Sequence, residues 1–243
     1  MSDCLISVEA VTKKYGDLVA VDGVTLRVAG GEIYALVGAN GAGKSTLIRM
    51  LVGISAPDGG AVLVGGEHLT AHRRAASPHV KRRIGYLPEE LFLYQRLTGH
   101  EFLRLVAGLK GANPDGIARE IEFFELKEVQ HKWVGGYSLG MRKKLGLAAA
   151  FTGTPDVLVL DEPLNGLDVE MMRKLRLRLE TERDAGRAVL VSSHVMSFVE
   201  RISDRIGIMR AARLVTEGTP EELRAQTEMV DAPFEDVFFR LAK

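Results

Sequence analysis

Short apolar runs alternate with stretches of helical periodicity along most of this chain. That alternation is typical of a mainly parallel β-sheet whose strands are joined and covered by helices. Later apolar runs predict strands at residues 33–37, 61–64, 83–87, 157–160, 188–192, 205–209 and 214–217. Two earlier runs, at 5–11 and 24–28, are expected to form antiparallel strands. The pattern therefore predicts an α/β fold with a mainly parallel sheet and an antiparallel β subdomain.

Helices are expected between the strands, and several have recognisable boundaries. Met171, Leu175 and Leu179 recur at four-residue spacing before Gly186, which ends the predicted helix. Two capping boxes, in which a threonine and a glutamate satisfy backbone N–H groups at a helix start, are expected at Thr98 with Glu101 and at Thr219 with Glu222.

The segment from about residue 90 to 136 carries helical patterns without a strand signal. We interpret it as part of a helical subdomain, at about 89–154, inserted into an α/β core formed by 1–88 and 155–243. The whole chain is then one domain, which a length of 243 residues and a hydrophobic content of 46% allow.

Charge and cysteine content exclude several classes of protein. Lys plus Arg and Asp plus Glu number 32 each, so no overall field favours nucleic acid or an anionic membrane. The single cysteine excludes an internal disulfide and suits a reducing cytosol. No run approaches the roughly 18 apolar residues of a membrane span, and no signal peptide is recognisable at the start. We expect a soluble cytoplasmic chain.

A glycine-rich run follows the predicted strand 33–37 and fits the phosphate-binding pattern G-x-x-x-x-G-K-[ST]. Its residues are Gly38, Ala39, Asn40, Gly41, Ala42, Gly43, Lys44, Ser45 and Thr46. Glycines let the backbone curl so that N–H groups point at phosphate oxygens, and the following helix adds a partial positive charge. Lys44 is expected between the β- and γ-phosphates, and the Ser45 hydroxyl is expected to bind Mg²⁺.

Two adjacent carboxylates end the apolar run 157–160. Asp161 is expected to hold Mg²⁺, and Glu162 to polarise the attacking water as general base. Burying unpaired charge is costly, so such a pair is seldom present for packing alone. Together with the glycine-rich loop, it predicts a P-loop nucleoside triphosphatase.

Further motifs resemble those of the ATP-binding cassette (ABC) proteins, in the family's order. They are Tyr15 in a Lys-Lys-Tyr-Gly sequence, Ile-Gly-Tyr-Leu-Pro-Glu at 84–89, Tyr-Ser-Leu-Gly-Met at 137–141, Leu-Asp at 167–168, and Ser-Ser-His at 192–194. The third is similar to the family signature, usually L-S-G-G-Q. The last residues, 234–241, look like those of exporter-type subunits that pair with separate permease chains.

The resemblance implies roles for particular residues. Tyr15 would stack on adenine, a contact worth about 1 kcal/mol beyond its buried area, although a plain surface tyrosine is the alternative. His194 would donate a hydrogen bond to the γ-phosphate and act in catalysis with Glu162 and Lys44. Ser138 and Gly140 would face the nucleotide of a partner subunit, and Asp168 would cross that interface.

The family resemblance also implies partners. Two Mg²⁺-ATP molecules would lie between two head-to-tail cassettes, as a homodimer or as a heterodimer with a second cassette subunit. An integral membrane permease would place the chain at the inner face of the cell membrane, and no nucleic acid is expected. The alternatives are a cassette ATPase that acts on ribosomes or DNA, and a nucleotide switch without hydrolysis.

Two departures from the family pattern stand near the expected site. Glu89 occupies a position usually held by glutamine and would place a carboxylate beside Mg²⁺ and the attacking water. Leu139 replaces the first glycine of the signature, and Met141 replaces its glutamine. Trp133, just before the signature, is expected to be a packing residue, and the His- and Arg-rich stretch from His68 to Arg83 a solvated connector.

Overall fold

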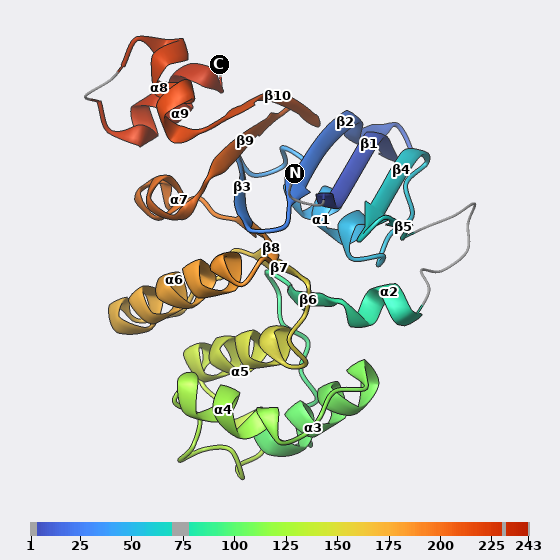
Figure 1. Ribbon diagram of the computed structural model, residues 1–243, viewed down its shortest axis with the longest axis vertical. Coiled ribbons are helices and arrows are strands. Elements are labelled where there is room, and N and C mark those ends of the chain that lie inside the picture. Colours follow the sequence, from blue (N-terminus) through green and yellow to red (C-terminus); the bar gives the residue numbers. More distant parts are fainter. Residues whose placement is uncertain (1–3, 70–77, 230–231, 243) are drawn as a thin grey trace.

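Two β-sheets and the helices around them make up the molecule (Figure 1). The computed structural model describes residues 4–69, 78–229 and 232–242. His72, Arg73 and Arg74 of the expected connector lie outside the described residues. None of the described helices is long and apolar enough to cross a bilayer.

The larger sheet has the strand order β10-β9-β3-β8-β7-β6, and all but its β10–β9 pair are parallel. Its strands are β3 (Glu32–Gly38), β6 (Ile84–Leu87), β7 (Val157–Asp161), β8 (Ala188–Ser192), β9 (Arg205–Arg210) and β10 (Arg213–Gly218). Each begins and ends within about one residue of its predicted run. Because parallel strands end at the same edge, Gly38, Asp161 and Ser192 gather there, and Asp161 is directly paired with Ser192.

The smaller sheet is antiparallel, with the order β2-β1-β4-β5. Its strands are β1 (Cys4–Tyr15), β2 (Leu18–Ala29), β4 (Gly59–Val64) and β5 (Glu67–His68). The prediction placed the start of β2 six residues too late. Leu18 and Val19 are exposed, so burial gave no sign of a strand there, yet they pair with Tyr15 and Lys14 across the hairpin.

Helices follow the strands as expected. They are α1 (Lys44–Leu51), α2 (Pro78–Arg82), α3 (Gly99–Lys110), α4 (Gly116–Phe123), α5 (Leu139–Phe151), α6 (Val169–Asp184), α7 (Met196–Ile202), α8 (Pro220–Thr227) and α9 (Phe234–Leu241). Both predicted capping boxes are present, at the starts of α3 and α8. Met171, Leu175 and Leu179 are all buried on one face of α6, which confirms that periodicity.

Helices α3, α4 and α5 lie between β6 and β7 in the sequence and at one end of the molecule (Figure 1). Helix α5 packs closely on β6. A Cβ at Gly85 would lie only 2.3 Å from the Ala150 carbonyl oxygen, so a larger residue would not fit there. One turn earlier, a Cβ at Gly146 would lie within 3 Å of side-chain atoms of Leu91 and Leu87. These two glycines let the helix approach the sheet.

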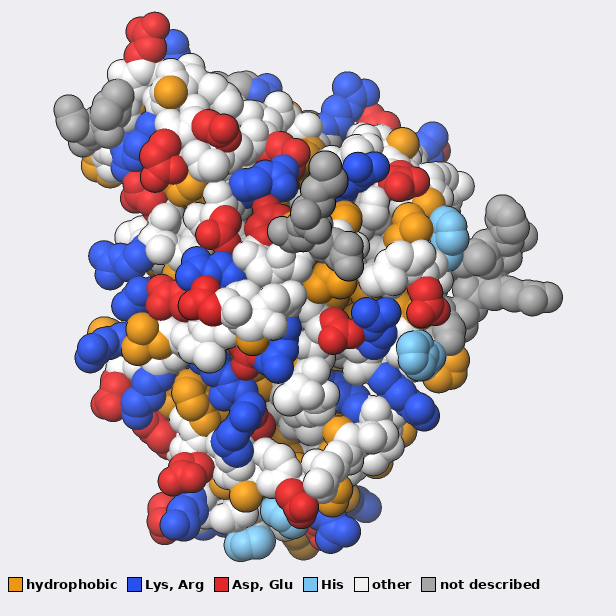
Figure 2. All heavy atoms as spheres, in the orientation of Figure 1, with side chains coloured by type: hydrophobic (Ala, Val, Ile, Leu, Met, Phe, Trp, Pro, Cys, Tyr) orange, Lys and Arg blue, Asp and Glu red, His pale blue; other side chains and the backbone are white. Residues whose placement is uncertain are grey.

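The expectation for Trp133 was wrong. Its backbone forms an isolated bridge with Thr98, but 69% of the residue is exposed. A short 3₁₀ turn at Val134–Gly136 follows it, and Val134, not the indole, is the buried member of this segment. Acidic and basic side chains are interspersed over the face drawn in Figure 2.

Candidate nucleotide-binding site

The glycine-rich loop turns sharply between β3 and α1, and two of its glycines are required by close contacts. Gly43 has φ +104°, and a Cβ there would lie 2.3 Å from the Ala20 carbonyl oxygen. A Cβ at Gly38 would lie 2.5 Å from the Met209 carbonyl oxygen. Any side chain at these positions would displace the loop from β2 or β9.

The loop presents positive charge to its own concave side. Helix α1 begins after Gly43 without a side-chain cap, so its first N–H groups are available to an anion. The Lys44 ammonium donates hydrogen bonds to the carbonyl oxygens of Gly38, at 2.7 Å, and Ala39, at 3.3 Å. These contacts hold the cation inside the loop, where a phosphate oxygen could replace a carbonyl as acceptor.

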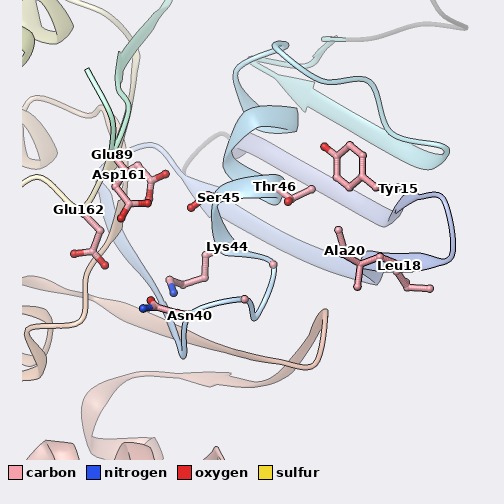
Figure 3. A pocket seen from close by; sticks show the side chains of 13 residues that line it. Tyr15, Leu18, Ala20, Asn40, Lys44, Ser45, Thr46, Glu89, Asp161 and Glu162 are labelled. Atoms are coloured by element: carbon pink, nitrogen blue, oxygen red, sulfur yellow. The ribbon is translucent and has the colours of Figure 1, made fainter. Parts of the chain in front are cut away.

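A cavity of about 380 Å³ opens in front of this loop. Figure 3 shows Tyr15, Leu18 and Ala20 on one side of it, and Glu89, Asp161 and Glu162 on the other, with the loop residues between. The complete lining is Tyr15, Leu18, Val19, Ala20, Asn40, Gly41, Gly43, Lys44, Ser45, Thr46, Glu89, Asp161 and Glu162. Most of the predicted site residues are thus brought together in one place.

The side contributed by the β1–β2 hairpin is apolar. Tyr15 is half exposed, and Leu18, Val19 and Ala20 extend this surface along the start of β2. An apolar surface in the same cavity as the phosphate-binding loop can contact the base of a nucleotide. Tyr15 was expected here from the sequence, whereas the three aliphatic residues were not. The feature that could have identified them is the apolar run that directly follows the hairpin turn. Leu18 and Val19 in this run are exposed, so packing does not explain why they are apolar.

Three carboxylates, Glu89, Asp161 and Glu162, form the opposite side, which we call the acidic wall. The Ser192 hydroxyl donates a hydrogen bond to Asp161, with 2.5 Å from Oγ to Oδ1, and accepts one from the Glu162 N–H at 3.0 Å. Ser192 thereby fixes both residues at the sheet edge. This serine was part of a recognised motif, but its role needs the pairing of β7 with β8 to be seen.

Glu162 adopts an unusual backbone conformation for a residue with a side chain. Its φ of +48° lies in the left-handed region, which costs free energy and persists only where the surroundings hold it. The carboxylate is buried and points at the cavity, where its Oε2 lies 2.9 Å from His194 Nδ1. Strain, burial and a histidine partner are features of a reactive carboxylate.

Hard oxygen donors for a divalent cation line the same cavity, namely the Ser45 hydroxyl and the carboxylates of Asp161 and Glu89. They suit Mg²⁺, which prefers oxygen and retains water. Within the described ranges, no group of three or more His, Cys, Asp or Glu side chains is placed to hold a metal by itself. Ser45, Asp161 and Glu89 could contribute oxygen ligands to Mg²⁺ beside phosphate oxygens and water.

A second cavity, of about 420 Å³, adjoins the acidic wall. Its polar lining includes Asn40, Glu89, Glu162 and His194, all near the expected position of a γ-phosphate. Its other residues are Gly38, Ala39, Asn165, Met196, Glu235, Phe238 and Phe239, the last three from α9. Sequence reasoning missed α9 here, because nothing in a local pattern shows which distant element a helix will approach.

The signature residues do not line either cavity. Ser138 caps α5 and accepts a hydrogen bond from the Met141 N–H, and Asp168 caps α6 in the same way through the Met171 N–H. Gly140 is needed locally, since a Cβ there would lie 2.9 Å from the Gly166 carbonyl oxygen. Beside them, Leu139 and Val169 are largely exposed.

Relatives and solved structures agree on the family. A family model described as ABC transporter matches residues 21–165. The probable multidrug ABC transporter ATP-binding protein YbhF of Escherichia coli is 35% identical over 98% of this chain, which spans only 42% of YbhF. The bacitracin transport ATP-binding protein BcrA of Enterococcus faecalis is 36% identical over 90% of this chain and 70% of BcrA.

Solved structures with the same fold include an ATP-binding subunit of an ABC transporter, with a TM-score of 0.91 and 30% identity over 98% of this chain and 100% of that one. A dimeric bacterial ABC transporter cassette has a TM-score of 0.82 at 22% identity, over 88% of this chain and 98% of its own. The ordered motifs, the matched family model and the curated relatives together show that the chain belongs to the ABC transporter family.

Proposed function

We propose that this chain is the ATP-hydrolysing subunit of an exporter, and that it works as one of two cassettes beneath a membrane permease. The observation that carries the proposal is the acidic wall, which faces the phosphate-binding loop across one cavity and whose Glu162 is hydrogen-bonded to His194. The relatives named for multidrug and bacitracin transport support the exporter assignment. In this family the permease carries the transport specificity, so the substrate is not assigned.

The cavity orders the groups that phosphoryl transfer needs. The start of α1 and Lys44 would hold the β- and γ-phosphates, and Tyr15 with the aliphatic hairpin residues would take the adenine. When bound, Mg²⁺ would neutralise developing charge on the phosphate oxygens, held by Ser45, Asp161 and, in this chain, Glu89. Glu162 would accept a proton from the attacking water, and His194 would orient Glu162 and reach the γ-phosphate.

The signature residues would complete the neighbouring subunit's site. The N-terminus of α5, with Ser138 as its cap, could offer N–H donors and a helix dipole to a phosphate, but it does not line this chain's own cavities. Largely exposed Leu139 and Val169 lie beside Ser138 and Asp168. A second cassette, placed head to tail, would cover this apolar surface and bring the two signatures to the two nucleotides.

A separate surface is suited to a permease. Phe92 and Tyr94, three and five residues after Glu89 of the acidic wall, are strongly exposed. They line a cavity of about 380 Å³ between this segment and the start of α5, together with Leu91, Leu93, Gln95, Val134 and Arg142. Exposed aromatic side chains around a hollow are typical of a protein-binding site. Its connection to Glu89 would transmit the state of the nucleotide site.

The Glu162→Gln variant tests the catalytic part of the proposal. We expect it to lose ATP turnover and retain ATP binding, because the amide keeps the shape but cannot accept the proton. With ATP and Mg²⁺ it should sediment as a dimer, whereas the parent chain should be a monomer without nucleotide. Turnover within a few-fold of the parent would reject Glu162 as base, and a persistent monomer would reject the paired sites.

Pull-down from solubilised membranes tests the partner. Capture of a multi-span membrane protein by the Glu162→Gln chain with ATP would support the exporter assignment. Capture of ribosomal proteins or DNA, without a permease, would instead favour a cassette ATPase that acts on those partners. A variant with Phe92 and Tyr94 both changed to Ser should bind ATP as before and lose the permease.

A further inference from the structure

Lys143, in the first half of α5, has a buried ammonium group without a hydrogen-bond partner. The residue is 3% exposed, and its Nζ contacts no acceptor among the described residues. An unpaired buried charge costs several kcal/mol in proteins, so such groups are usually paired or replaced by apolar ones. Burial is the largest influence on Lys143 and lowers its pKa, and the charges of Asp161, Glu162 and Glu89 oppose this in part. The unusual feature is therefore a cation kept next to the acidic wall.

The packing of α5 on β6 explains how Lys143 reaches that position. Ala150 lies over Gly85, and Gly146 lies by Leu87. Four helical residues and two strand residues both advance about 6 Å, so the helix and strand stay in step as they run in opposite directions. Lys143, three residues before Gly146, then lies beyond the end of β6, at the level of Glu89. Asp161 ends the adjacent strand there.

The charge of the acidic wall suggests what this cation does. Asp161 and Glu162 are the acidic pair expected in a P-loop triphosphatase, and Glu89 adds a third carboxylate where the ABC family usually has a neutral glutamine. Lys44, across the cavity, is held by carbonyl oxygens of its own loop. Lys143, by contrast, has no hydrogen-bond partner among the described residues, and the charges of these three carboxylates act on its ammonium.

We propose that Lys143 is a positioning residue whose ammonium balances the acidic wall and offsets the additional charge of Glu89. Like charges would otherwise push Glu89 away from Asp161 and Glu162, and the direction of Glu162 toward the attacking water would change. Because Lys143 belongs to the signature helix, the same charge interaction links that helix to the acidic wall. The proposal deepens the proposed function, since it rests on the acidic wall being the site of hydrolysis.

The test is a double-mutant cycle between Lys143→Met and Glu89→Gln, each measured for ATP turnover. Methionine keeps most of the length of the unbranched side chain and removes its charge. We expect Lys143→Met to lower kcat about tenfold with KM for ATP within about twofold. In the Glu89→Gln background the same change should lower kcat less than about threefold, since the excess charge is gone.

Metal binding gives a second reading that does not depend on turnover. Mn²⁺ affinity of the chain loaded with a non-hydrolysable ATP analogue can be measured by electron paramagnetic resonance. Removing a nearby cation should tighten Mn²⁺ binding about tenfold in Lys143→Met, and Glu89→Gln should oppose this, so that the double variant returns to within about threefold of the parent. Lys143→Arg should resemble the parent in both measurements if it folds.

Lys174→Met on α6 is the matched control, because Lys174 pairs with exposed Glu125 and Glu170 on the surface. It should leave turnover and Mn²⁺ affinity unchanged. An equal loss of kcat in both Glu89 backgrounds, or a Mn²⁺ affinity that ignores Lys143, would overturn the proposal and leave Lys143 a structural residue. If the parent chain bound ATP without hydrolysing it, the proposed function would fail. The Mn²⁺ affinities would still show whether the charge of Lys143 acts on the acidic wall.

Discussion

His194 Nδ1 lies 2.9 Å from Glu162 Oε2, and the two side chains differ sharply in burial. The imidazole is 65% exposed, whereas the carboxylate is 9% exposed. The histidine therefore bridges solvent-facing space and a buried acid that is already strained at φ +48°. A ring in this position can hold the carboxylate in one direction and still reach a phosphate in the cavity.

Changing His194→Ala should lower kcat about 100-fold while ATP binding changes little, because orientation of a general base contributes to the transition state more than to nucleotide affinity. Steady-state hydrolysis and equilibrium binding of a fluorescent ATP analogue would separate the two effects. His68→Ala, at an exposed position in β5, is the control and should retain parent activity. Loss of nucleotide binding in His194→Ala would show that the ring acts mainly in binding.

Glu89→Gln should remain active, because most ligands of a bound Mg²⁺ come from water and phosphate oxygens. The loss of one negative charge should weaken the apparent affinity for Mg²⁺ by only about threefold. Titration of ATP turnover with Mg²⁺ at fixed ATP gives this number. A complete loss of hydrolysis with unchanged ATP binding would mean that the Glu89 carboxylate takes a direct chemical part.

Fold class and most strands followed from the sequence, because the parallel strands are buried on both faces and appear as unbroken apolar runs, such as residues 157–160 of β7. The predictions that failed concern apolar residues that are exposed. The first residues of β2 pair across a hairpin without being buried, and Trp133 lies on the surface although tryptophan usually packs. A hydrophobic pattern predicts burial, and Leu18, Val19 and Trp133 are apolar residues that are exposed.

Some residues of the site could be placed from the sequence, and others could not. Residues contiguous in a motif, such as Gly38 to Thr46, could be placed because the loop chemistry itself requires the spacing. The roles of Ser192 and Lys143 could not, since each depends on which elements lie side by side: β8 on β7, and α5 on β6. Phe238 and Phe239 reach the cavity beside Glu162 from the last helix, a contact that no local pattern encodes.

Ser138→Arg should prevent the ATP-dependent dimer in a Glu162→Gln background. Ser138 accepts a hydrogen bond at the start of α5 and has no contact with the chain's own cavities, so a long cation there would enter only the partner's site. Sedimentation with ATP and Mg²⁺ should show monomers, while binding of ATP to each monomer persists. Ser138→Thr keeps the capping hydroxyl and should dimerise. A dimer of normal affinity in Ser138→Arg would place the interface elsewhere.

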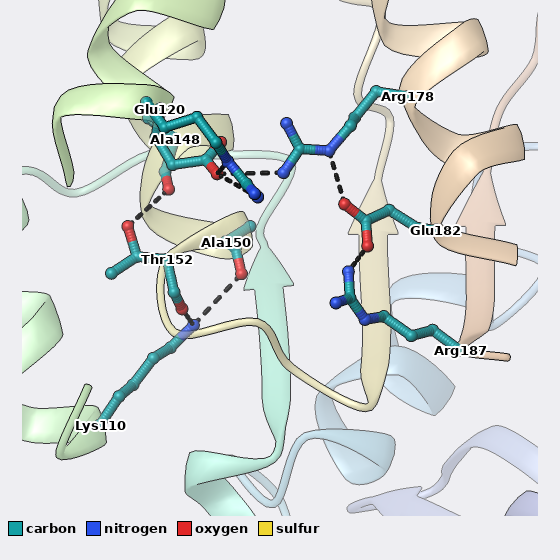
Figure 4. A network of polar contacts seen from close by, with 9 residues as sticks. Lys110, Glu120, Ala148, Ala150, Thr152, Arg178, Glu182 and Arg187 are labelled. Carbon is teal, nitrogen blue, oxygen red and sulfur yellow. Dashed lines mark hydrogen bonds and ion pairs between the residues drawn. The ribbon is translucent and has the colours of Figure 1, made fainter. Parts of the chain in front are cut away.

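A buried network of ion pairs joins α4, α6 and Arg187, which directly precedes β8 (Figure 4). Arg178 donates to Glu120 at 3.0 Å and to Glu182 at 2.5 Å, and Glu182 also pairs with Arg187. The Arg178 guanidinium lies about 5 Å from the ring centres of Phe123 and Phe151. The side chains of Arg178, Glu120 and Glu182 are all at most 10% exposed. This arginine connects α4 to α6, the helix that Asp168 caps.

Arg178→Met should therefore destabilise the chain by about 3 kcal/mol, the lower end for breaking a buried ion pair, because Arg119 and Arg187 still balance part of the charge on Glu120 and Glu182. In a domain of this size, that loss corresponds to a fall of about 8 °C in the thermal unfolding midpoint. Arg176→Met removes a more exposed pair with Glu180 on the same helix, and should cost only about 0.5 kcal/mol. Calorimetry of both variants gives the comparison. Equal midpoints would show that Arg178 contributes no more than a surface charge, and that the helical region is held to α6 by apolar packing alone.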